Sequence, residues 1–199
     1  MDNSLLDNIK NLGLTSEELI QVQKHISKIV ALMSGVVSRG KIEIMVPDPT
    51  VDDTIYIDRS LKLVDLHGVH LVYSELENVG PTQYRISDVG LWLHPNQKLG
   101  EVVSGLEVYK YLREQDMLKS CFGRIDLSAI FSRDLGFFRQ YFAGKVLCAW
   151  KSVGEDWWGD VWVPALFEDH NGKLVMDQIS SGDDWEYNHV APIFTSDSI

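Results

Sequence analysis

This sequence is short of basic residues and cysteines, and it contains no long apolar run. Only 18 Lys or Arg stand against 29 Asp or Glu, which gives the 199-residue chain a formal net charge of -11. A surface with this charge repels phosphates, so direct binding to nucleic acid or to anionic membranes is not expected. Its natural partner is a basic protein. The 2 cysteines, Cys121 and Cys148, form no CxxC or CxxH pattern, so they do not predict a zinc site.

The sequence also lacks the marks of export and of membrane insertion. Its first residues, Met-Asp-Asn-Ser, contain neither the basic nor the apolar region of a signal peptide. No apolar run approaches the length of about 20 residues that a membrane-spanning helix needs. We therefore expect a cytoplasmic protein with reduced thiols. Apolar neighbours beside Cys121 and Cys148 predict buried and unreactive side chains.

The motifs of several common enzyme classes are missing. The sequence contains no GxGxxG, P-loop, HExxH, GxSxG or kinase signature. Asp48, Asp52 and Asp53 resemble a calcium loop in composition, but the bend glycine and the final bidentate glutamate are absent. These residues predict a solvated turn. We therefore assign no catalytic residue and expect no metal and no cofactor.

The periodicity of the apolar residues predicts an α+β fold with three parts. These are an N-terminal amphipathic helix, a mixed middle region and a C-terminal antiparallel β meander. Apolar residues recur every three or four positions over residues 19–37, and Gly40 follows as a typical C-terminal glycine. From residue 41 the period changes to two. We divide the chain into a helical arm at 1–40 and an α+β body at 41–199, with a second boundary near 97–104 as an alternative.

The apolar stripe over residues 19–37 has two interpretations. It packs on the protein's own sheet, or it pairs with the same helix of a second copy to give a homodimer. Fewer than three full heptads are present, without organised charge pairs beside them. Packing within one chain, and hence a monomer, is the favoured interpretation.

Within the body, turn residues separate short elements. Ser104 or Gly105 is expected to begin a helix that ends near residue 118, and Asp126 is expected to cap the next. Bulky residues at 137–142 predict a third helix. Strands are expected at 54–58, 61–66, 84–86, 90–93, 146–152, 160–168 and 173–180. Asn171-Gly172 predicts a hairpin between the last two strands.

Aromatic and acidic residues are concentrated near the C-terminus. Five of the 6 tryptophans lie within residues 145–194, and the acidic residues after Lys151 are accompanied by a single basic one, Lys173. Two loops, 154–160 and 181–189, place rings and carboxylates among turn residues. Tryptophan and tyrosine are typical interface anchors, and a carboxylate rim selects a basic partner. We therefore predict partner binding by these residues: Glu155, Asp156, Trp157, Trp158, Asp183, Asp184, Trp185, Glu186 and Tyr187.

The function that this pattern favours is a non-enzymatic, acidic protein-interaction module. One specific form is an inhibitor of the phage or mobile-element type, whose carboxylates imitate the phosphates of a nucleic acid. The alternative is a small hydrolase or a carbohydrate-binding protein that uses carboxylates with His67, His70 or His189. A simpler interpretation also remains: the rings build the core and the acids form a solvated edge.

Overall fold

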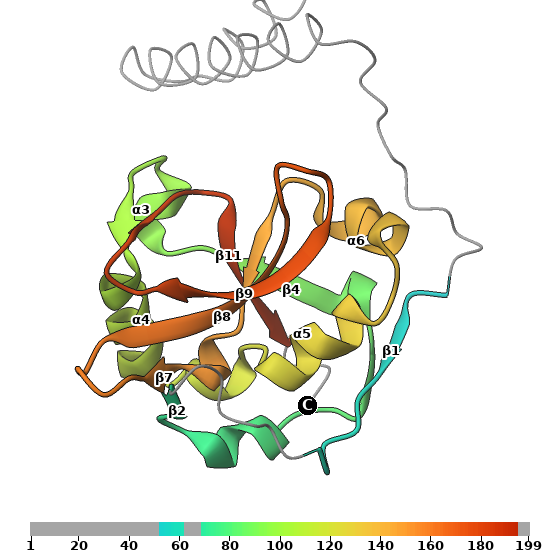
Figure 1. The fold of residues 1–199 in the computed structure, drawn as a ribbon, viewed down its shortest axis with the longest axis horizontal. Helices are drawn as coiled ribbons and strands as arrows, with labels where there is room; N and C mark the ends of the chain where they lie inside the picture. The colour runs from blue at the N-terminus through green and yellow to red at the C-terminus, as the bar shows by residue number, and fades with distance from the viewer. Residues whose placement is uncertain (1–51, 62–68, 195–199) are drawn as a thin grey trace, which may run out of the picture. The chain divides into compact units, whose positions relative to one another are not determined.

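The computed structural model describes residues 52–61 and 69–194 (Figure 1). The predicted arm at 1–40, its stripe at 19–37, most of the strand predicted at 61–66, and His67 lie outside these residues. The chain divides into two compact units, 1–45 and 46–199, and every described residue belongs to the second. The alternative boundary near 97–104 falls inside this unit.

A mixed sheet of seven strands occupies the centre of the second unit (Figure 1). Its order is β2-β7-β8-β6-β11-β4, and β9 lies on the other side of β8. The strands are β2 (His70–Leu71), β4 (Val89–Trp92), β6 (Val146–Cys148), β7 (Gly154–Glu155), β8 (Val161–Glu168), β9 (Leu174–Ser180) and β11 (His189–Phe194). The short strands β6 and β7 pair with different halves of β8, because the 3-10 turn η4 (Trp150–Ser152) interrupts the chain between them.

The hairpin predicted at Asn171-Gly172 is confirmed, since β8 and β9 pair antiparallel around it. Gly172 has a φ of 74°, a left-handed conformation that favours glycine. The Asp169 carboxylate accepts the backbone N–H groups of Asn171 and Lys173 at 2.9 and 2.8 Å, which closes the turn. The predicted C-terminal meander is not confirmed as a simple antiparallel one, because β11 lies parallel to β6.

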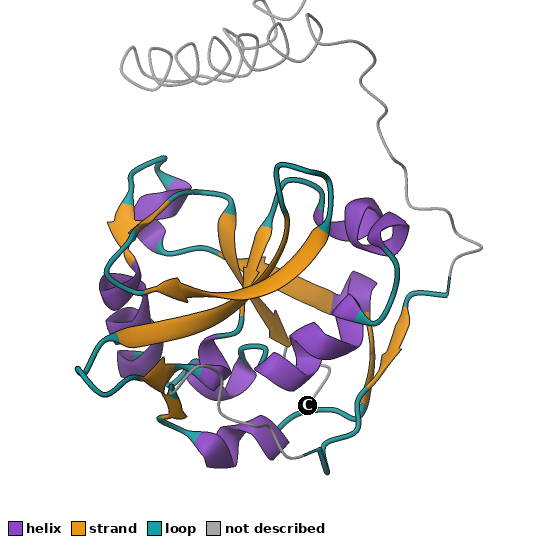
Figure 2. Ribbon diagram, viewed as in Figure 1, coloured by secondary structure: helices purple, strands orange, loops and turns teal. Residues whose placement is uncertain are grey.

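Helices and two small ribbons complete the fold (Figure 2). The helices are α3 (Pro95–Lys98), α4 (Gly105–Glu114), α5 (Arg124–Phe131) and α6 (Leu135–Phe142), with 3-10 turns η1 (Ser74–Asn78), η2 (Ile86–Asp88) and η3 (Leu118–Ser120). One ribbon pairs β1 (Thr54–Tyr56) with β3 (Gln83–Arg85), and the other pairs β5 (Val103–Ser104) with β10 (Asp184–Trp185). The predicted α+β class is therefore confirmed.

The helix starts include one correct and one wrong prediction from the sequence. Ser104 caps α4 as predicted, because its hydroxyl accepts the N–H of Glu107. The prediction that Asp126 caps its helix is wrong, because α5 begins at Arg124 and its N-cap is Gly123. Asp126 lies in the first turn, and its carboxylate accepts the N–H of Gly123 at 2.8 Å. Glycine has no side-chain acceptor, so the third helical residue supplies one from inside the helix.

The sheet is buried on both faces. Alternating strand residues enter two separate clusters: Leu147 and Leu166 join the one that contains α5 and α6, whereas Cys148 and Ala165 join the one that contains α4. Both cysteines are free and buried, as predicted. Burial raises the pKa of Cys121 to about 12, so its thiol is unreactive near neutrality.

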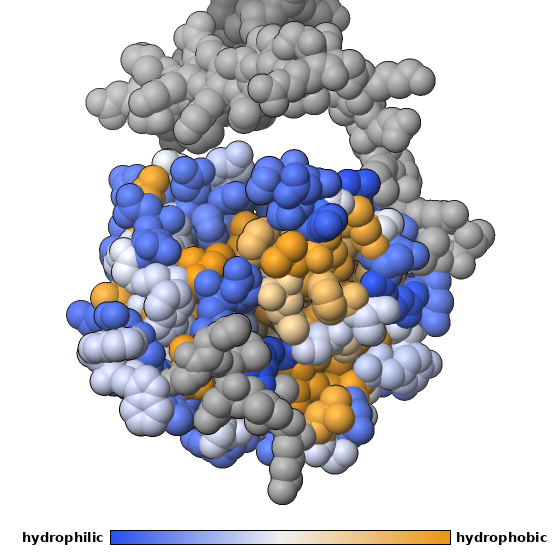
Figure 3. Space-filling view, in the orientation of Figure 1, coloured by the Kyte–Doolittle hydropathy of each residue, from blue (hydrophilic) through white to orange (hydrophobic). Residues whose placement is uncertain are grey.

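Within the described part of the chain, β9 pairs with β8 alone and therefore lies at an edge of the sheet. Gln178 of β9 lies opposite Pro164 of β8. Pro164 has no N–H, and its carbonyl accepts the N–H of Ala149 on the β6 side of the strand. The backbone N–H and carbonyl of Gln178 therefore point away from β8. The carboxylate of Asp177 accepts the N–H of Gln178 at 2.8 Å. Six of the seven β9 residues are half-buried, and hydrophobic side chains gather on the face that Figure 3 shows, in the region of β9.

Candidate functional site

A turn with two exposed tryptophans connects β7 to β8. We call residues 155–160 the Trp turn. One Asp156 oxygen accepts the N–H groups of Trp158 and Asp160 at 2.9 and 3.0 Å, and the other accepts the indole N–H of Trp162 at 3.0 Å. These bonds, the Trp162 bond above all, lower the pKa of Asp156. The carboxylate is therefore ionised at neutral pH and holds the turn in one conformation.

The two rings of the Trp turn are open to solvent. Trp157 is 74% exposed and Trp158 is 84% exposed. The rings of His70 and Trp157 are nearly perpendicular, with centroids 4.8 Å apart. Glu155 and Asp160 are also exposed beside the rings. Adjacent tryptophans with this exposure on an ordered turn are typical of a contact surface rather than of a core.

The second predicted loop divides into exposed and buried residues. We call residues 183–187 the acidic loop; Asp183, Asp184, Glu186 and Tyr187 are exposed in it. Trp185 is 1% exposed, and its indole N–H donates to the carbonyl of Ser180. Its ring packs against that of Trp150, with centroids 4.8 Å apart. Trp185 is therefore a core residue that anchors the acidic loop, and it is not an exposed contact.

The fold places the Trp turn and the acidic loop next to each other. Ser181, just before the acidic loop, donates its N–H to the carbonyl of Val161, just after the Trp turn, at 2.8 Å. In sequence these positions are separated by the whole β8–β9 hairpin. Lys145 lies over the exposed ring of Tyr187, 5.6 Å from its centroid. Two loops that are separate in the sequence therefore adjoin in the folded chain.

A third segment, residues 97–107, adjoins the acidic loop and is absent from the sequence-based prediction. Leu106 N–H donates to the Ser181 carbonyl at 2.8 Å, and the Gln97 side chain donates to the Glu186 carbonyl at 2.7 Å. The strand pairing of β5 with β10 adds a ladder between the two segments. Only pairing between distant parts of the chain creates this neighbourhood, and no local pattern signals it.

The third segment exposes both apolar and acidic side chains, as the Trp turn and the acidic loop together do. Leu99 is 74% exposed, Val102 52% and Leu106 50%. The carboxylates of Glu101 and Glu107 are exposed among them. Apolar side chains surrounded by carboxylates extend the candidate contact surface beyond the residues that the sequence predicts.

His189 and His70 are the two described histidines that the alternative hydrolase would use. His189 Nδ1 accepts the backbone N–H of Glu186 at 3.2 Å, and desolvation lowers the pKa of this imidazole. His70 contacts Trp157, as described above. Within residues 52–61 and 69–194, no group of three His, Cys, Asp or Glu side chains is arranged to hold a metal ion.

A second unusual site lies in the interior, where Arg59, Glu77, Asp126 and Lys151 form a buried charge cluster. Arg59 binds Asp126 through two nitrogens, at 2.7 and 3.2 Å, and also donates to the carbonyl of Pro81. The Asp126 side chain is 0% exposed. Lys151 is fully buried, and its Nζ donates to the carbonyl of Val79 at 2.8 Å. Desolvation lowers the pKa of Lys151, although Asp126 opposes this effect.

Glu77 is the unsatisfied member of the buried charge cluster. It is 4% exposed, and within the described residues neither carboxylate oxygen accepts a hydrogen bond. Desolvation raises its pKa most, whereas the backbone N–H groups of Ile125 and Arg124 and the charge of Lys151 lower it, so the carboxylate does have favourable neighbours. The carboxylate lies over Gly123, where any Cβ would come within 2.6 Å of Oε2. A lone glutamate within a 3-10 turn carries no sequence signal that would predict its burial.

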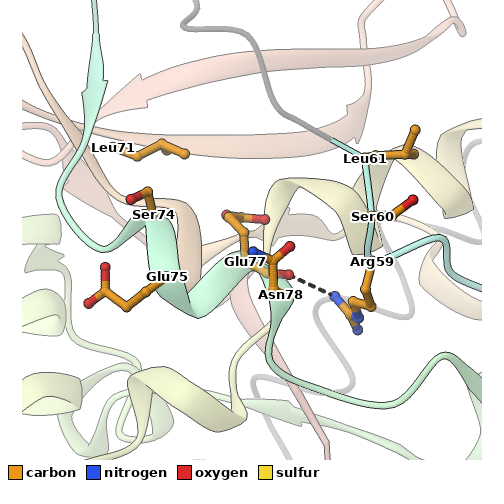
Figure 4. A pocket seen from close by; sticks show the side chains of 8 residues that line it. All are labelled: Arg59, Ser60, Leu61, Leu71, Ser74, Glu75, Glu77 and Asn78. Carbon is orange, nitrogen blue, oxygen red and sulfur yellow. Dashed lines mark hydrogen bonds between the residues drawn. The ribbon is translucent and has the colours of Figure 1, made fainter.

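Glu77 also lines a pocket of about 570 Å³ beside η1 (Figure 4). Leu71, Ser74 and Glu75 lie on one side of it, and Arg59, Ser60 and Leu61 on the other. Polar groups beside apolar walls are typical of small-ligand sites.

The described part of the chain includes no helix of the length and apolarity that a membrane crossing requires. No protein-family model matches the chain. Searches of curated proteins and of solved structures gave no match either.

Proposed function

We propose that the protein is a non-enzymatic interaction module that binds a basic protein partner through the Trp turn and the acidic loop. One observation carries this proposal: Trp157 and Trp158 are 74% and 84% exposed on a turn that a single carboxylate holds closed. Tryptophan is enriched among the residues that dominate binding energy at interfaces. An ordered turn loses little conformational entropy on binding, so it favours affinity.

Charge defines the partner. The formal net charge is -11, and Glu155, Asp160, Asp183, Asp184 and Glu186 are exposed in the Trp turn and the acidic loop. Carboxylates at the rim of an interface speed the encounter with a positively charged surface and discriminate against acidic proteins. The specific form that we propose is an inhibitor of a nucleic-acid-binding protein, in which these carboxylates occupy a groove built for phosphates. The free buried thiols support a reducing compartment such as the cytoplasm.

Quantitative affinity capture from the native host tests the proposal. The variant Trp157→Ala/Trp158→Ala should lose the captured partner, whereas Tyr56→Ala should retain it. Tyr56 is a matched control because it is also an exposed ring, at 67%, but lies on β1. Capture should weaken as salt rises, because screening acts on exposed charges. Equal capture by the wild type and the double tryptophan variant, with unchanged circular dichroism, would eliminate the Trp turn as the contact.

A second variant separates the charges from the rings. Asp183→Asn/Asp184→Asn/Glu186→Gln retains the tryptophans and removes three exposed carboxylates. We expect slower association and a weaker dependence on salt, with a smaller change in dissociation rate. The partner's own charge provides a further check. A captured protein with an acidic surface would contradict the proposed class.

A further inference from the structure

The ribbon that β5 forms with β10 has one buried face and one exposed face. Val103 lies opposite Trp185 in this ribbon, and these side chains are 2% and 1% exposed. Side chains alternate between the two faces of a strand, so the neighbours of this buried pair lie on the outer face. Val102, Asp184 and Glu186 are such neighbours, and all three are exposed. The outer face therefore places an apolar side chain beside two carboxylates.

Two leucines extend this outer face along the third segment. Leu99 and Leu106 are both at least half exposed. The carbonyl of Asn96 accepts the N–H groups of Leu99 and Glu101, both at 3.0 Å, and Leu106 donates its N–H to Ser181. Because these bonds hold the segment in place before any partner binds, little conformational entropy is lost on binding. We call the exposed residues of the ribbon and its flanks the ribbon face: Leu99, Val102, Leu106, Asp184 and Glu186.

The charge around the ribbon face favours a basic occupant. Residues 97–107 contain two carboxylates and residues 183–187 contain three, against a single ammonium, that of Lys98. Lys145 adds a cation at the end of the acidic loop, where it lies over the ring of Tyr187. The excess of negative charge attracts a positively charged segment, whereas a second copy of this chain, with its net charge of -11, would be repelled.

The small size of the ribbon determines the form of the occupant. Its strands have two residues each, so they offer too little backbone to pair with an added strand. A helix needs no backbone pairing with its receptor. An apolar stripe with Lys or Arg on both sides of it complements apolar side chains beside carboxylates. We propose that the ribbon face binds a basic amphipathic helix of the partner; this inference rests on the proposed function, because the acidic loop belongs to both surfaces.

A synthetic amphipathic peptide tests this proposal on the full chain. The probe has about 14 residues, two repeats of Leu-Lys-Lys-Leu-Leu-Lys-Leu, whose leucines form one stripe when the peptide is helical. One control contains the same residues in an order without helical periodicity, and the other replaces each Lys with Glu.

We expect the probe to change amide chemical shifts at residues 99–107 and 183–187. The control without periodicity should bind about tenfold more weakly, since it cannot present its charges and its leucines together, and the acidic control should not bind. Equal affinities for the probe and the control without periodicity, or shifts confined to residues 155–160, would overturn the proposal.

Substitutions on the ribbon face separate its apolar and charged contributions. Val102→Asn/Leu106→Asn removes two apolar contacts and should weaken probe binding by about tenfold or more. Asp184→Asn/Glu186→Gln should weaken probe binding and reduce its dependence on salt, because fewer exposed charges are then screened. Leu61→Asn is the matched control and should bind as the wild type does, because Leu61 is 54% exposed but lies outside both segments.

Unchanged probe affinity in Val102→Asn/Leu106→Asn, with native circular dichroism, would refute the location. If that variant does not fold, Asp184→Asn/Glu186→Gln decides the location by the same criterion, since it alters only exposed side chains.

Capture from the native host distinguishes this inference from the proposed function. If Trp157→Ala/Trp158→Ala loses the partner while Val102→Asn/Leu106→Asn retains it in full, the proposed function stands and the ribbon face is refuted. If Trp157→Ala/Trp158→Ala retains the partner while the probe still shifts residues 99–107, the ribbon face stands and the Trp turn is refuted as the contact.

Discussion

Removal of the Asp126 carboxylate should destabilise this protein more than removal of any exposed carboxylate. In Asp126→Ala the Arg59 guanidinium, whose side chain is 9% exposed, loses both of its hydrogen bonds to the carboxylate. The N–H of Gly123 loses its acceptor as well. Breaking a buried ion pair on one side typically costs about 3–5 kcal/mol, because the remaining charge stays buried without compensation. That is a large part of the usual stability of about 5–15 kcal/mol.

Urea denaturation followed by far-ultraviolet circular dichroism measures this loss. With an m-value of about 2 kcal/mol/M, the midpoint should fall by about 2 M. The double variant Arg59→Met/Asp126→Leu should recover much of the loss, because it removes both charges and not only one. Glu168→Ala breaks the Arg139–Glu168 pair, whose side chains are 44% and 25% exposed, and should change the midpoint little. Equal shifts for Asp126→Ala and Glu168→Ala would refute the argument from burial.

Three further predictions concern local geometry. Asp156→Ala should accelerate proteolysis within the Trp turn, because three N–H groups lose their acceptor; uniform cleavage rates at residues 155–160 would contradict this. Folding lowers the pKa of Asp156 from its ordinary value of 3.8. Its contribution to stability is therefore complete above the ordinary value and is lost as the pH falls through the lower, folded-state pKa. Acid titration of the wild type and of Asp156→Asn measures this loss. Gly80→Ala should lower the free energy of unfolding by about 1–3 kcal/mol, measured by urea denaturation. Gly80 has a φ of 126°, and the new Cβ would lie 2.9 Å from Arg59 Nη2. An unchanged urea midpoint would contradict this prediction and show that the turn relaxes freely.

Local chemistry could be predicted from the sequence where neighbouring residues determine it. Asn171-Gly172 predicted the β8–β9 hairpin, and Ser104 predicted the start of α4, because a turn and a cap depend on nearby residues. The error at Asp126 was also local. Its carboxylate bonds the backbone three residues before it, so an acid near a helix start marks either the cap or the first turn.

Burial of individual rings could not be predicted. Trp158 and Trp185 both lie within two residues of acidic side chains in the sequence, yet they are 84% and 1% exposed. Trp185 packs against Trp150 and His189, and these contacts form only after the chain has folded. The same applies to Glu77, whose burial depends on Gly123 and the start of α5. These outcomes depend on contacts between distant segments, which the periodicity of one strand or helix does not encode.

The open edge at β9 has a consequence for how this protein behaves at high concentration. Open edges allow strands from other molecules to add and can begin cross-β stacking. Asp177 protects this edge in two ways, because its carboxylate accepts the outward N–H of Gln178 and places a charge on an exposed position. We therefore expect this single side chain, in the middle of β9, to obstruct the addition of a strand from another molecule.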